Sequence, residues 1–514
     1  MLGILSTRKS DVFEYANTML HNLSRKNKHA WVVTSEMAVI QSSKMLASIG
    51  ILALVSFNEP VKKQHAYVYD GQIFGDIKEM PGDLEKIFRS TIQTLGGEYS
   101  LAATDGNKIA VARDSLGRRP IFYAKNEEIL AYACEKKALW SIGLRNVKPL
   151  RAGTSAVLDE NGIKIVEAAH FKKRDFKQQD FDSIVKEYEQ LLIQAFEKRL
   201  EGQKKIGALL SGGVDSTLST MLTSKYAREM GEEIIVYTAG TKDAIDVAFA
   251  ERFTREFGLN HKVRKLDVSD VANLIPKVVK AVEERDFVQV EAGIGVYAAE
   301  EMAAHDGVEL IVSGQGPDEL WGGYRWYPRV IAEEGYDAYS EKNWGDLTRA
   351  DIETLDRENK LAWANGLKAV FPYIDTAFVN LAMSVPPQLK INSPNDAMGK
   401  RPHRALAKKV GIPQEFADRG KDAAQHGTGI HDLLDAVAKQ NDFTPDLVRK
   451  VNYKSADISD EYLSSSARYG YRYADKKLWL VDEHIQFYID SVAHRKGILN
   501  ESERKKIETY LEKI

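Results

Sequence analysis

The sequence predicts an α+β domain at the N-terminus, followed by an α/β domain with a parallel sheet. In the first third, short runs of β-forming residues are separated by Asp-Gly, Asn-Gly and Gly-Gly pairs, which is typical of strands joined by tight turns. After the polar stretch 173–180, amphipathic helices alternate with single apolar strands, and this rhythm predicts crossover connections in a parallel sheet. We therefore expect two domains, 1–172 and 180–514.

The expected strands of the first domain are apolar and short. The run ILALVSF at 51–57, for example, combines β-branched, aromatic and small residues over the length of an ordinary strand. By the same reasoning we expect strands at 30–35, 51–57, 66–69, 100–104, 108–113, 129–134 and 154–158.

The expected elements of the second domain alternate in type. Phe249, Phe253 and Phe257 recur at helical spacing, and Gly258 is suited to cap that helix. Strands are expected at 205–210, 234–238, 261–266 and 309–312, and helices at 217–228, 246–257, 270–283 and 292–305. The region 461–514 reads as further helices.

Composition excludes several functional classes. The 514 residues carry 71 Lys and Arg against 74 Asp and Glu, so the chain has no global basic charge to attract nucleic acid. The single cysteine, Cys134, excludes a disulfide framework and a thiolate zinc site. We see neither an apolar run long enough to span a membrane nor a signal sequence. We therefore expect a cytoplasmic protein with no nucleic-acid or membrane partner.

One hexapeptide carries the strongest chemical signal. Ser211-Gly212-Gly213-Val214-Asp215-Ser216 lies between an expected strand and an expected helix. Two glycines let the backbone approach an anion closely, and a helix N-terminus adds partial positive charge. No Gly-Lys-Ser/Thr follows, so this is not a Walker A loop. The pattern predicts a phosphate-binding loop.

This hexapeptide resembles the SGG-x-DS pyrophosphate loop of the ATP pyrophosphatase group, and within it the class B asparagine synthetase and β-lactam synthetase superfamily. Three further segments resemble that superfamily in the same order. They are SGQGPDELWGGY at 313–324, RENK through FPYID at 357–375, and Arg419-Gly420-Lys421. The resemblance implies a doubly wound ATP pyrophosphatase domain with a helical C-terminal extension.

The resemblance also implies a reaction and its residues. A substrate carboxylate attacks the α-phosphorus of ATP, pyrophosphate leaves, and a nitrogen nucleophile converts the acyl-adenylate to an amide. ATP and Mg²⁺ are the implied cofactors, with Asp215 and Asp318 as metal ligands and Lys421 as the catalytic lysine. The other implied ATP contacts are Ser211, Gly212, Gly213, Ser216, Tyr237, Thr238, Gly240, Ser313, Gly314 and Lys400. Lys400 equally fits a solvated loop lysine.

The first domain resembles a class II glutaminase. GQIF at 71–74 and ARDSLGRRPIFY at 112–123 match segments of that family, which implies an N-terminal-nucleophile fold of four αββα layers. An active glutaminase needs a cysteine at its mature N-terminus, whereas here position 2 is Leu2. RKNK at 25–28 also stands where the family has its RGPD glutamine-binding stretch. We therefore expect an inactive glutaminase-like domain and a ligase that uses free ammonia.

The group that activates the nucleophile is less clear from the sequence. Gln315 occupies the position of a glutamate in asparagine synthetase and of a tyrosine in β-lactam synthetase, and a neutral amide is no general base. By position, Glu291 and Asp356 are the alternative catalytic candidates. Glu291 equally fits a group that binds a substrate amine, or a structural carboxylate.

We expect an ATP-dependent amide ligase that takes a small amino-acid-like carboxylate and ammonia or an amine. The alternatives are a β-lactam-synthetase-like ligase that uses an amine on the substrate itself, and a non-catalytic nucleotide-binding homologue. Tyr469, Arg472 and Tyr473 share one helical face, which favours internal packing or a homodimer contact over base stacking.

Overall fold

A computed structural model of the chain describes residues 1–8, 12–24, 30–42, 51–62, 65–74, 83–167, 171–172, 175–420, 427–458 and 482–514. Lys421, the stretch 25–28 and the group 469–473 lie outside the described residues. The chain divides into two units. The first is Met1–Lys172 with Ala350–Asn359, and the second is Lys173–Arg349 with Lys360–Ile514.

The first unit contains two antiparallel sheets. The first sheet has the order β11 (Lys148–Pro149), β9 (Phe122–Lys125), β10 (Ile129–Ala133), β1 (Leu2–Ser6), β4 (Leu52–Ser56), β2 (Ala30–Thr34) and β3 (Val39–Ser42). The second has the order β13 (Gly162–Glu167), β12 (Thr154–Asp159), β8 (Ile109–Arg113), β7 (Gly96–Thr104), β6 (Ala66–Phe74) and β5 (Val61–Lys62).

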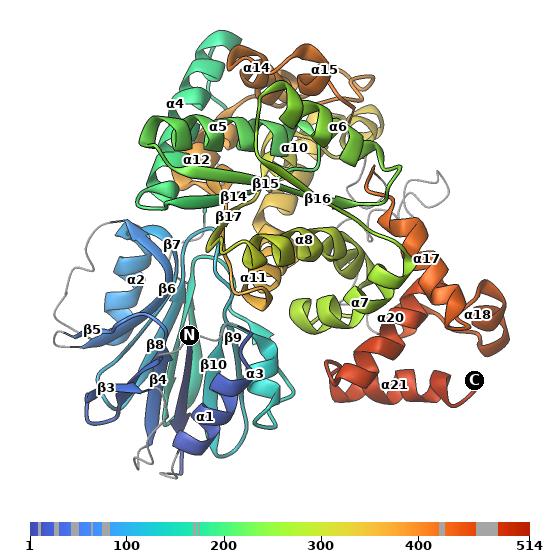
Figure 1. Ribbon diagram of the computed structural model, residues 1–514. Helices are drawn as coiled ribbons and strands as arrows, with labels where there is room; N and C mark the ends of the chain where they lie inside the picture. The colour runs from blue at the N-terminus through green and yellow to red at the C-terminus, as the bar shows by residue number, and fades with distance from the viewer. Residues whose placement is uncertain are drawn as a thin grey trace. The chain divides into compact units, whose positions relative to one another are not determined.

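Apolar residues join these sheets face to face. Leu54 and Leu130 of the first sheet share one core with Val68 and Val111 of the second. On the outer side of the second sheet, Phe88 of α2 (Leu84–Thr94) packs in another core. Helices α1 (Phe13–Asn22) and α3 (Lys136–Trp140) pack on the first sheet. The unit is thus layered helix, sheet, sheet, helix (Figure 1), which explains why strands such as β4 and β8 are buried on both faces.

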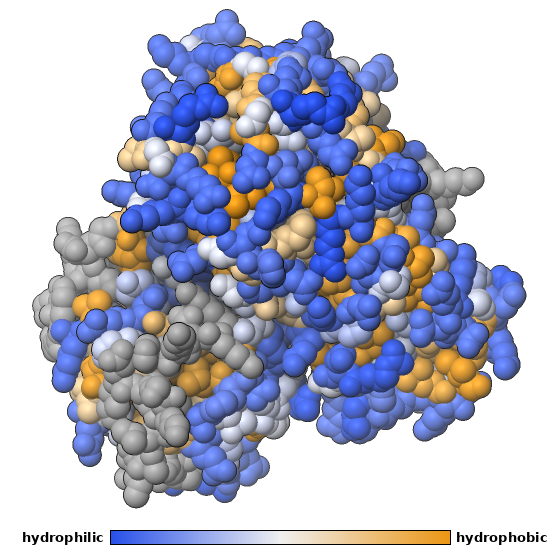
Figure 2. Space-filling view, viewed as in Figure 1, coloured by the Kyte–Doolittle hydropathy of each residue, from blue (hydrophilic) through white to orange (hydrophobic). Residues whose placement is uncertain are grey.

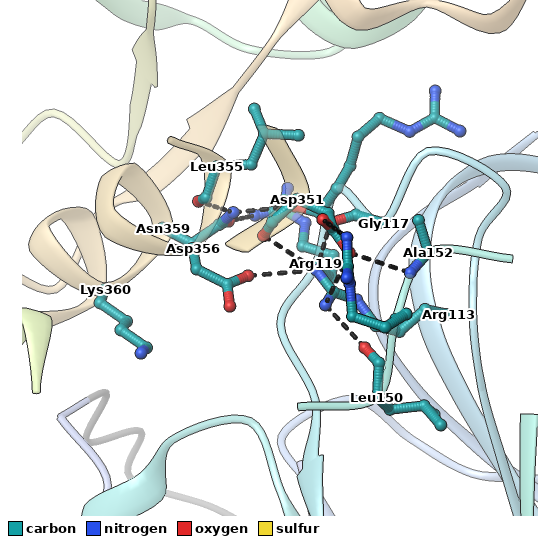
Figure 3. Close-up of polar contacts among 12 residues, drawn as sticks. Arg113, Gly117, Arg119, Leu150, Ala152, Asp351, Leu355, Asp356, Asn359 and Lys360 are labelled. Carbon is teal, nitrogen blue, oxygen red and sulfur yellow. Dashed lines mark hydrogen bonds and ion pairs between the residues drawn. The ribbon is translucent and has the colours of Figure 1, made fainter. Parts of the chain in front are cut away.

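Segment 350–359, although distant in sequence, belongs to the first unit through a buried ionic cluster (Figure 3). It comes from the end of α10 (Tyr327–Glu353) and the start of α11 (Leu355–Ala364). Arg113 NH2 lies 3.1 Å from Asp356 Oδ1, and Arg113 NH1 donates to Leu150 O at 2.8 Å. Asp351 accepts from Arg151 Nε at 3.1 Å. Two carboxylates of the segment therefore meet arginines of the sandwich.

The second unit is built on a five-stranded parallel sheet. Its order is β16 (His261–Lys265), β15 (Glu233–Gly240), β14 (Lys205–Leu209), β17 (Leu310–Val312) and β18 (Lys368–Val370). Helices α5 (Val214–Met230) and α6 (Ile245–Glu256) lie on one face of the sheet and α8 (Phe287–His305) on the other (Figure 1). The predicted mixture of a parallel sheet with many helices is confirmed. β18 is an addition to the four strands expected here.

The remaining helices of this unit surround the sheet. α4 (Phe181–Leu200) begins at Asp180, which accepts from Ser183 N, and α7 (Val268–Val282) begins with a capping box formed by Asp267 and Asp270. The others are α9 (Pro317–Trp321), η1 (Pro372–Ile374), α12 (Thr376–Ser384), α13 (Pro387–Lys390), α14 (Arg401–Lys409), α15 (Gln414–Ala417), α17 (Ile430–Gln440), α18 (Pro445–Val451), η2 (Ser455–Asp457), α20 (Glu483–Lys496) and α21 (Glu501–Leu511).

The C-terminal helices are attached by a buried ion pair. Arg285, which precedes α8, donates from Nε and NH2 to the two carboxylate oxygens of Asp490 in α20, each at 2.8 Å. Tyr453 OH donates to the same carboxylate at 2.6 Å. α17 and α20 also pack on α7. The C-terminal helices are therefore part of the second unit and not a separate appendage.

The surface and the helices agree with the expected class of protein. In the view of Figure 2, hydrophobic residues form separate patches among hydrophilic ones over the described part of the surface. None of the helices in the described ranges combines the length and the hydrophobicity that crossing a bilayer requires.

Lys390 is a buried lysine that makes no ion pair in the described part of the chain, and its environment is neutral. Its Nζ lies 3.5 Å from Asn343 Oδ1 and 4.0 Å from Met383 Sδ, and 5.9 Å from the centre of the Trp321 ring. Burial lowers the pKa of Lys390 to about 7. The folded protein therefore holds the proton less strongly than the unfolded chain does.

This depressed pKa predicts a pH-dependent gain from Lys390→Met. Below pH 7 both states are protonated, so the folded state carries the full cost of a buried charge. Above pH 7 the folded lysine releases its proton and this cost falls by about 1.4 kcal/mol per pH unit until the unfolded lysine titrates. We expect the variant to unfold at higher urea at pH 6, with the gain shrinking steadily towards pH 9. A gain that does not change with pH would contradict the assignment.

Candidate functional site

Two loops meet at the carboxyl edge of the parallel sheet. β14 pairs with β15 on one side and with β17 on the other, so the chain order reverses between β14 and β17, where such sheets bind ligands. Loop 210–213 follows β14 and loop 313–316 follows β17. A Cβ at Gly314 would lie 3.1 Å from Ser216 N. The two predicted loops therefore pack directly on each other.

The loop after β14 leaves helix N–H groups available to an anion. α5 begins after Gly213, which has no side chain to accept a hydrogen bond from the first turn. Exposed N–H groups and the helix dipole at this end favour negative charge. Ser216 Oγ donates to Gly213 O at 3.1 Å and accepts from Ser211 N at 3.1 Å. The two predicted serines thus close the loop around its glycines.

Gly212 admits no side chain. Its φ is +72°, and a Cβ there would lie 2.9 Å from Asp246 O and 2.9 Å from Arg419 NH1. Only glycine meets both the conformational and the steric requirement. The loop backbone is therefore enclosed by α6 and by the segment that precedes Lys421.

Lys400 lies between the two aspartates predicted to bind metal. Its Nζ is 2.5 Å from Asp215 Oδ2 and 2.7 Å from Asp318 Oδ1. The lysine side chain is 1% exposed, whereas the carboxylates are 19% and 14% exposed. Burial opposes its charge, but attraction by Asp215 and Asp318 raises the pKa of Lys400 above its ordinary value. Two strand ends thus direct their carboxylates at one cation.

The backbone around Lys400 is adapted to this position. Lys400 has φ +53°, in the left-handed region that costs a non-glycine residue about 1–2 kcal/mol. A Cβ at Gly399 would lie 2.2 Å from Gly322 O, and one at Gly323 would lie 1.9 Å from both Lys400 Cε and Asp318 Oδ1. The glycines of the GGY sequence therefore make room for the lysine.

His403 supports Asp215 from the opposite side. Its Nε2 lies 3.2 Å from Asp215 Oδ1, and its Nδ1 is 2.6 Å from Tyr188 OH. Burial lowers the pKa of His403 and raises that of Tyr188, so both are neutral near pH 7. Sequence analysis missed both residues, which bear no motif of their own.

The residues predicted near adenine have their side chains turned to structural partners. Tyr237 OH donates to Asp306 Oδ2 at 2.9 Å, and Thr238 Oγ1 donates to Leu210 O at 2.6 Å. A Cβ at Gly240 would lie 3.1 Å from Thr428 O. At this strand end the backbone, and not these two side chains, is what remains for a nucleotide.

Glu291 has a cationic partner that the sequence did not reveal. His431 Nδ1 lies 2.5 Å from Glu291 Oε1, and Nε2 lies 3.3 Å from Asp482 Oδ2. Hydrogen bonds to Asp482 and Glu291 raise the pKa of His431 to about 10. One turn further along α8, a Cβ at Gly295 would lie 3.7 Å from Ala239 O. Glu291 and His431 therefore form a charged pair near the end of β15.

Two other candidates stand apart from this group. Asp356 belongs to the first unit, where its carboxylate is paired with Arg113, so the structure does not group it with Lys400 or Glu291. Gln315 is in the loop after β17, and its backbone N donates to Ser313 Oγ at 3.3 Å. Lys421 lies beyond Gly420 in the segment that is not described.

The expected nucleophile position of the first unit is enclosed. Leu2 is fully buried, and the N-terminal amine of Met1 donates to Cys134 Sγ at 3.3 Å. Burial raises the pKa of Cys134 to about 11. This cysteine is therefore a protonated thiol at neutral pH, which is a poor nucleophile.

The oxygen donors near Lys400 fit a magnesium ion that is held jointly by protein and ligand. Asp215 and Asp318 converge on one point, and Mg²⁺ is commonly bound through one or two carboxylates plus substrate phosphates. In the described part of the chain, no group of three or more His, Cys, Asp or Glu residues could hold a metal. The two aspartates are thus suited to a metal that arrives with a polyphosphate.

Two family models match the chain. The asparagine synthase model matches residues 187–335 and 331–490, and that of a glutamine amidotransferase domain matches 62–141. A putative glutamine-hydrolysing asparagine synthetase of Methanocaldococcus jannaschii is 29% identical over 405 residues, covering 69% of this chain and 73% of its own. The glutamine-hydrolysing asparagine synthetase of Homo sapiens is 26% identical over 401 residues, covering 72% and 70%.

Likeness to solved structures is weaker. Glutamine phosphoribosylpyrophosphate amidotransferase from B. subtilis aligns with a TM-score of 0.28 at 14% identity, covering 47% of this chain and 66% of that chain. The NH3-dependent NAD synthetase from Campylobacter jejuni aligns with a TM-score of 0.24 at 13% identity, covering 54% and 90%. We draw no functional argument from these two alignments.

Proposed function

Because the chain belongs to the asparagine synthase family, we propose that it is an ATP-dependent carbon–nitrogen ligase. It adenylates the carboxylate of a small amino-acid-like substrate, releases pyrophosphate and passes the acyl group to a nitrogen nucleophile. The observation that carries this proposal is the convergence of Asp215, Asp318 and Lys400 beside an uncapped helix start. Such a site combines N–H donors, a cation and metal-binding oxygens.

Each part of the site has a role in the proposed reaction. The N–H groups at the start of α5 bind the departing pyrophosphate, and Lys400 contributes a positive charge beside it. Mg²⁺, when bound, would neutralise polyphosphate charge, with Asp215 and Asp318 as its protein ligands. We assign Lys421 to the charge that develops at the α-phosphate or the acyl carbon.

The nitrogen in this proposal comes from ammonia or an amine rather than from glutamine. The support is in the first unit, where Leu2 is fully buried and Cys134 is a buried thiol with a raised pKa. A glutaminase of this type needs an accessible thiolate. Glu291, beside His431, is our candidate for contact with the incoming amine or with the amino group of the substrate.

The test is a pyrophosphate-release assay with ATP, Mg²⁺ and a panel of amino-acid carboxylates, each with ammonium, with glutamine or with neither. We expect release with ammonium on one class of carboxylate, and a rate lower by about 10²–10³-fold in Lys421→Ala. Release without any added nitrogen source would assign the nucleophile to the substrate itself. Turnover on glutamine alone would overturn the ammonia proposal, and an unaffected Lys421→Ala would overturn the role of that lysine.

A further inference from the structure

The guanidinium of Arg419 is buried against the phosphate-binding loop with one nitrogen left over. Its side chain is 8% exposed. Its NH1 makes no hydrogen bond to any described residue, and it points at Gly212, where a Cβ would lie 2.9 Å from it. A buried N–H group without an acceptor is costly. An acceptor that arrives with a ligand of the loop would remove this cost.

The rest of the guanidinium is fixed in place. Arg419 NH2 pairs with Asp246 Oδ1 in the first turn of α6. The guanidinium lies 4.1 Å from the centre of the Phe249 ring, a separation at which a cation is attracted to the face of an aromatic ring. The side chain therefore has two protein partners that set its orientation, and NH1 is directed by them towards the loop.

The backbone of Arg419 is held by the same helix that begins after Lys400. Arg404 of α14 donates from NH1 to Arg419 O at 2.9 Å and to Ala417 O at 2.7 Å. It also donates from Nε to Gly399 O at 3.2 Å. One buried arginine thus fixes the segment that carries Arg419 and the segment that carries Lys400. Both cations are positioned before any ligand binds.

We propose that Arg419 is a polyphosphate-binding residue whose NH1 donates to an oxygen of the phosphates held by loop 211–216. This inference rests on the proposed function, because it takes a nucleotide polyphosphate as the ligand of that loop. A guanidinium suits this task, since it stays charged and presents its N–H groups in a fixed plane that matches phosphate oxygens. Arg419 approaches from α6 and the Phe249 ring, whereas Lys400 belongs to the aspartate pair.

The experiment measures the binding of ATP, inorganic pyrophosphate and AMP to the full chain by titration calorimetry in the presence of Mg²⁺. We expect Arg419→Met to weaken pyrophosphate and ATP binding by roughly 10- to 100-fold, as for a lost charge-assisted hydrogen bond. AMP binding should change less than about twofold, because AMP lacks the phosphates in question. Arg419→Gln keeps a donor for Asp246 without the charge and should show the same selective loss.

Arg252→Met is the matched control. Arg252 also lies over the Phe249 ring, at 5.2 Å, but it is half exposed and pairs with Glu415. Its replacement should leave pyrophosphate affinity unchanged. An equal loss of AMP and pyrophosphate affinity in Arg419→Gln, or no loss of either, would overturn the inference. If the wild-type chain binds neither ATP nor pyrophosphate, the proposed function fails before Arg419 is at issue.

Discussion

Replacing Lys400 by methionine should destabilise the ligand-free protein by about 3 kcal/mol, the lower end of the cost of removing one partner of a buried ion pair. The loss leaves Asp215 and Asp318 directed at one point without the cation that now compensates them. Their partial exposure keeps the cost at the lower end. The measurement is urea unfolding of the full chain without nucleotide.

Magnesium should partly reverse this loss. Without Lys400 the two carboxylates become free to bind a cation directly, so Mg²⁺ alone should raise the urea midpoint of Lys400→Met more than that of the wild type. Pyrophosphate release should fall by roughly 10²-fold, since a charge beside the departing group is lost. A variant as stable as the wild type and indifferent to Mg²⁺ would show that Lys400 does not compensate the aspartates.

Lys408→Met provides the control on the same helix. Lys408 belongs to α14 like the residues after Lys400, but its ammonium is 45% exposed and pairs with Asp418 at the surface. Exposed pairs of this kind contribute about 0–1 kcal/mol. Stability, Mg²⁺ response and pyrophosphate release should therefore remain close to those of the wild type.

The parts of the site that could be predicted from sequence are those whose chemistry is local. The phosphate-binding loop requires a strand, two glycines and a helix within a few residues, and all of these are visible in the sequence at 205–230. The convergence of Asp215 and Asp318 depends only on their following strands of one parallel sheet. By contrast, β18 has only three residues, too few for any periodicity to be recognised.

The parts that could not be predicted depend on contacts between distant residues. His403 meets Tyr188 across 215 residues and His431 meets Glu291 across 140, and neither histidine has a neighbour in sequence that signals its role. Position along the chain suggested a catalytic role for Asp356. The structure instead pairs it with Arg113, 243 residues earlier. A carboxylate in an otherwise suitable segment says nothing about which unit its side chain joins.

Arg113→Met should be the most destabilising change in the first unit. The guanidinium is fully buried and lies 3.1 Å from Asp356 Oδ1 and 3.8 Å from Asp351 Oδ2, and it also donates to Leu150 O (Figure 3). Methionine fills a similar volume but leaves two buried carboxylates with less compensation. We expect a loss of about 3–5 kcal/mol in the free energy of unfolding.

A double-mutant cycle separates the ion pair from the packing of Arg113. If the pair with Asp356 carries the effect, Asp356→Asn should itself destabilise the chain, and the double variant should lose at least about 1 kcal/mol less than the sum of the single losses. Arg8→Met is the control, because Arg8 is 58% exposed and pairs with Glu127 and Glu128 at the surface, where such pairs contribute little. Additive losses for Arg113 and Asp356 would show that the two side chains act independently. In that case Asp356 would be free for another role, and the position-based assignment of a catalytic carboxylate would return. Strong coupling would instead make Asp356 an anchor for segment 350–359 within the sandwich.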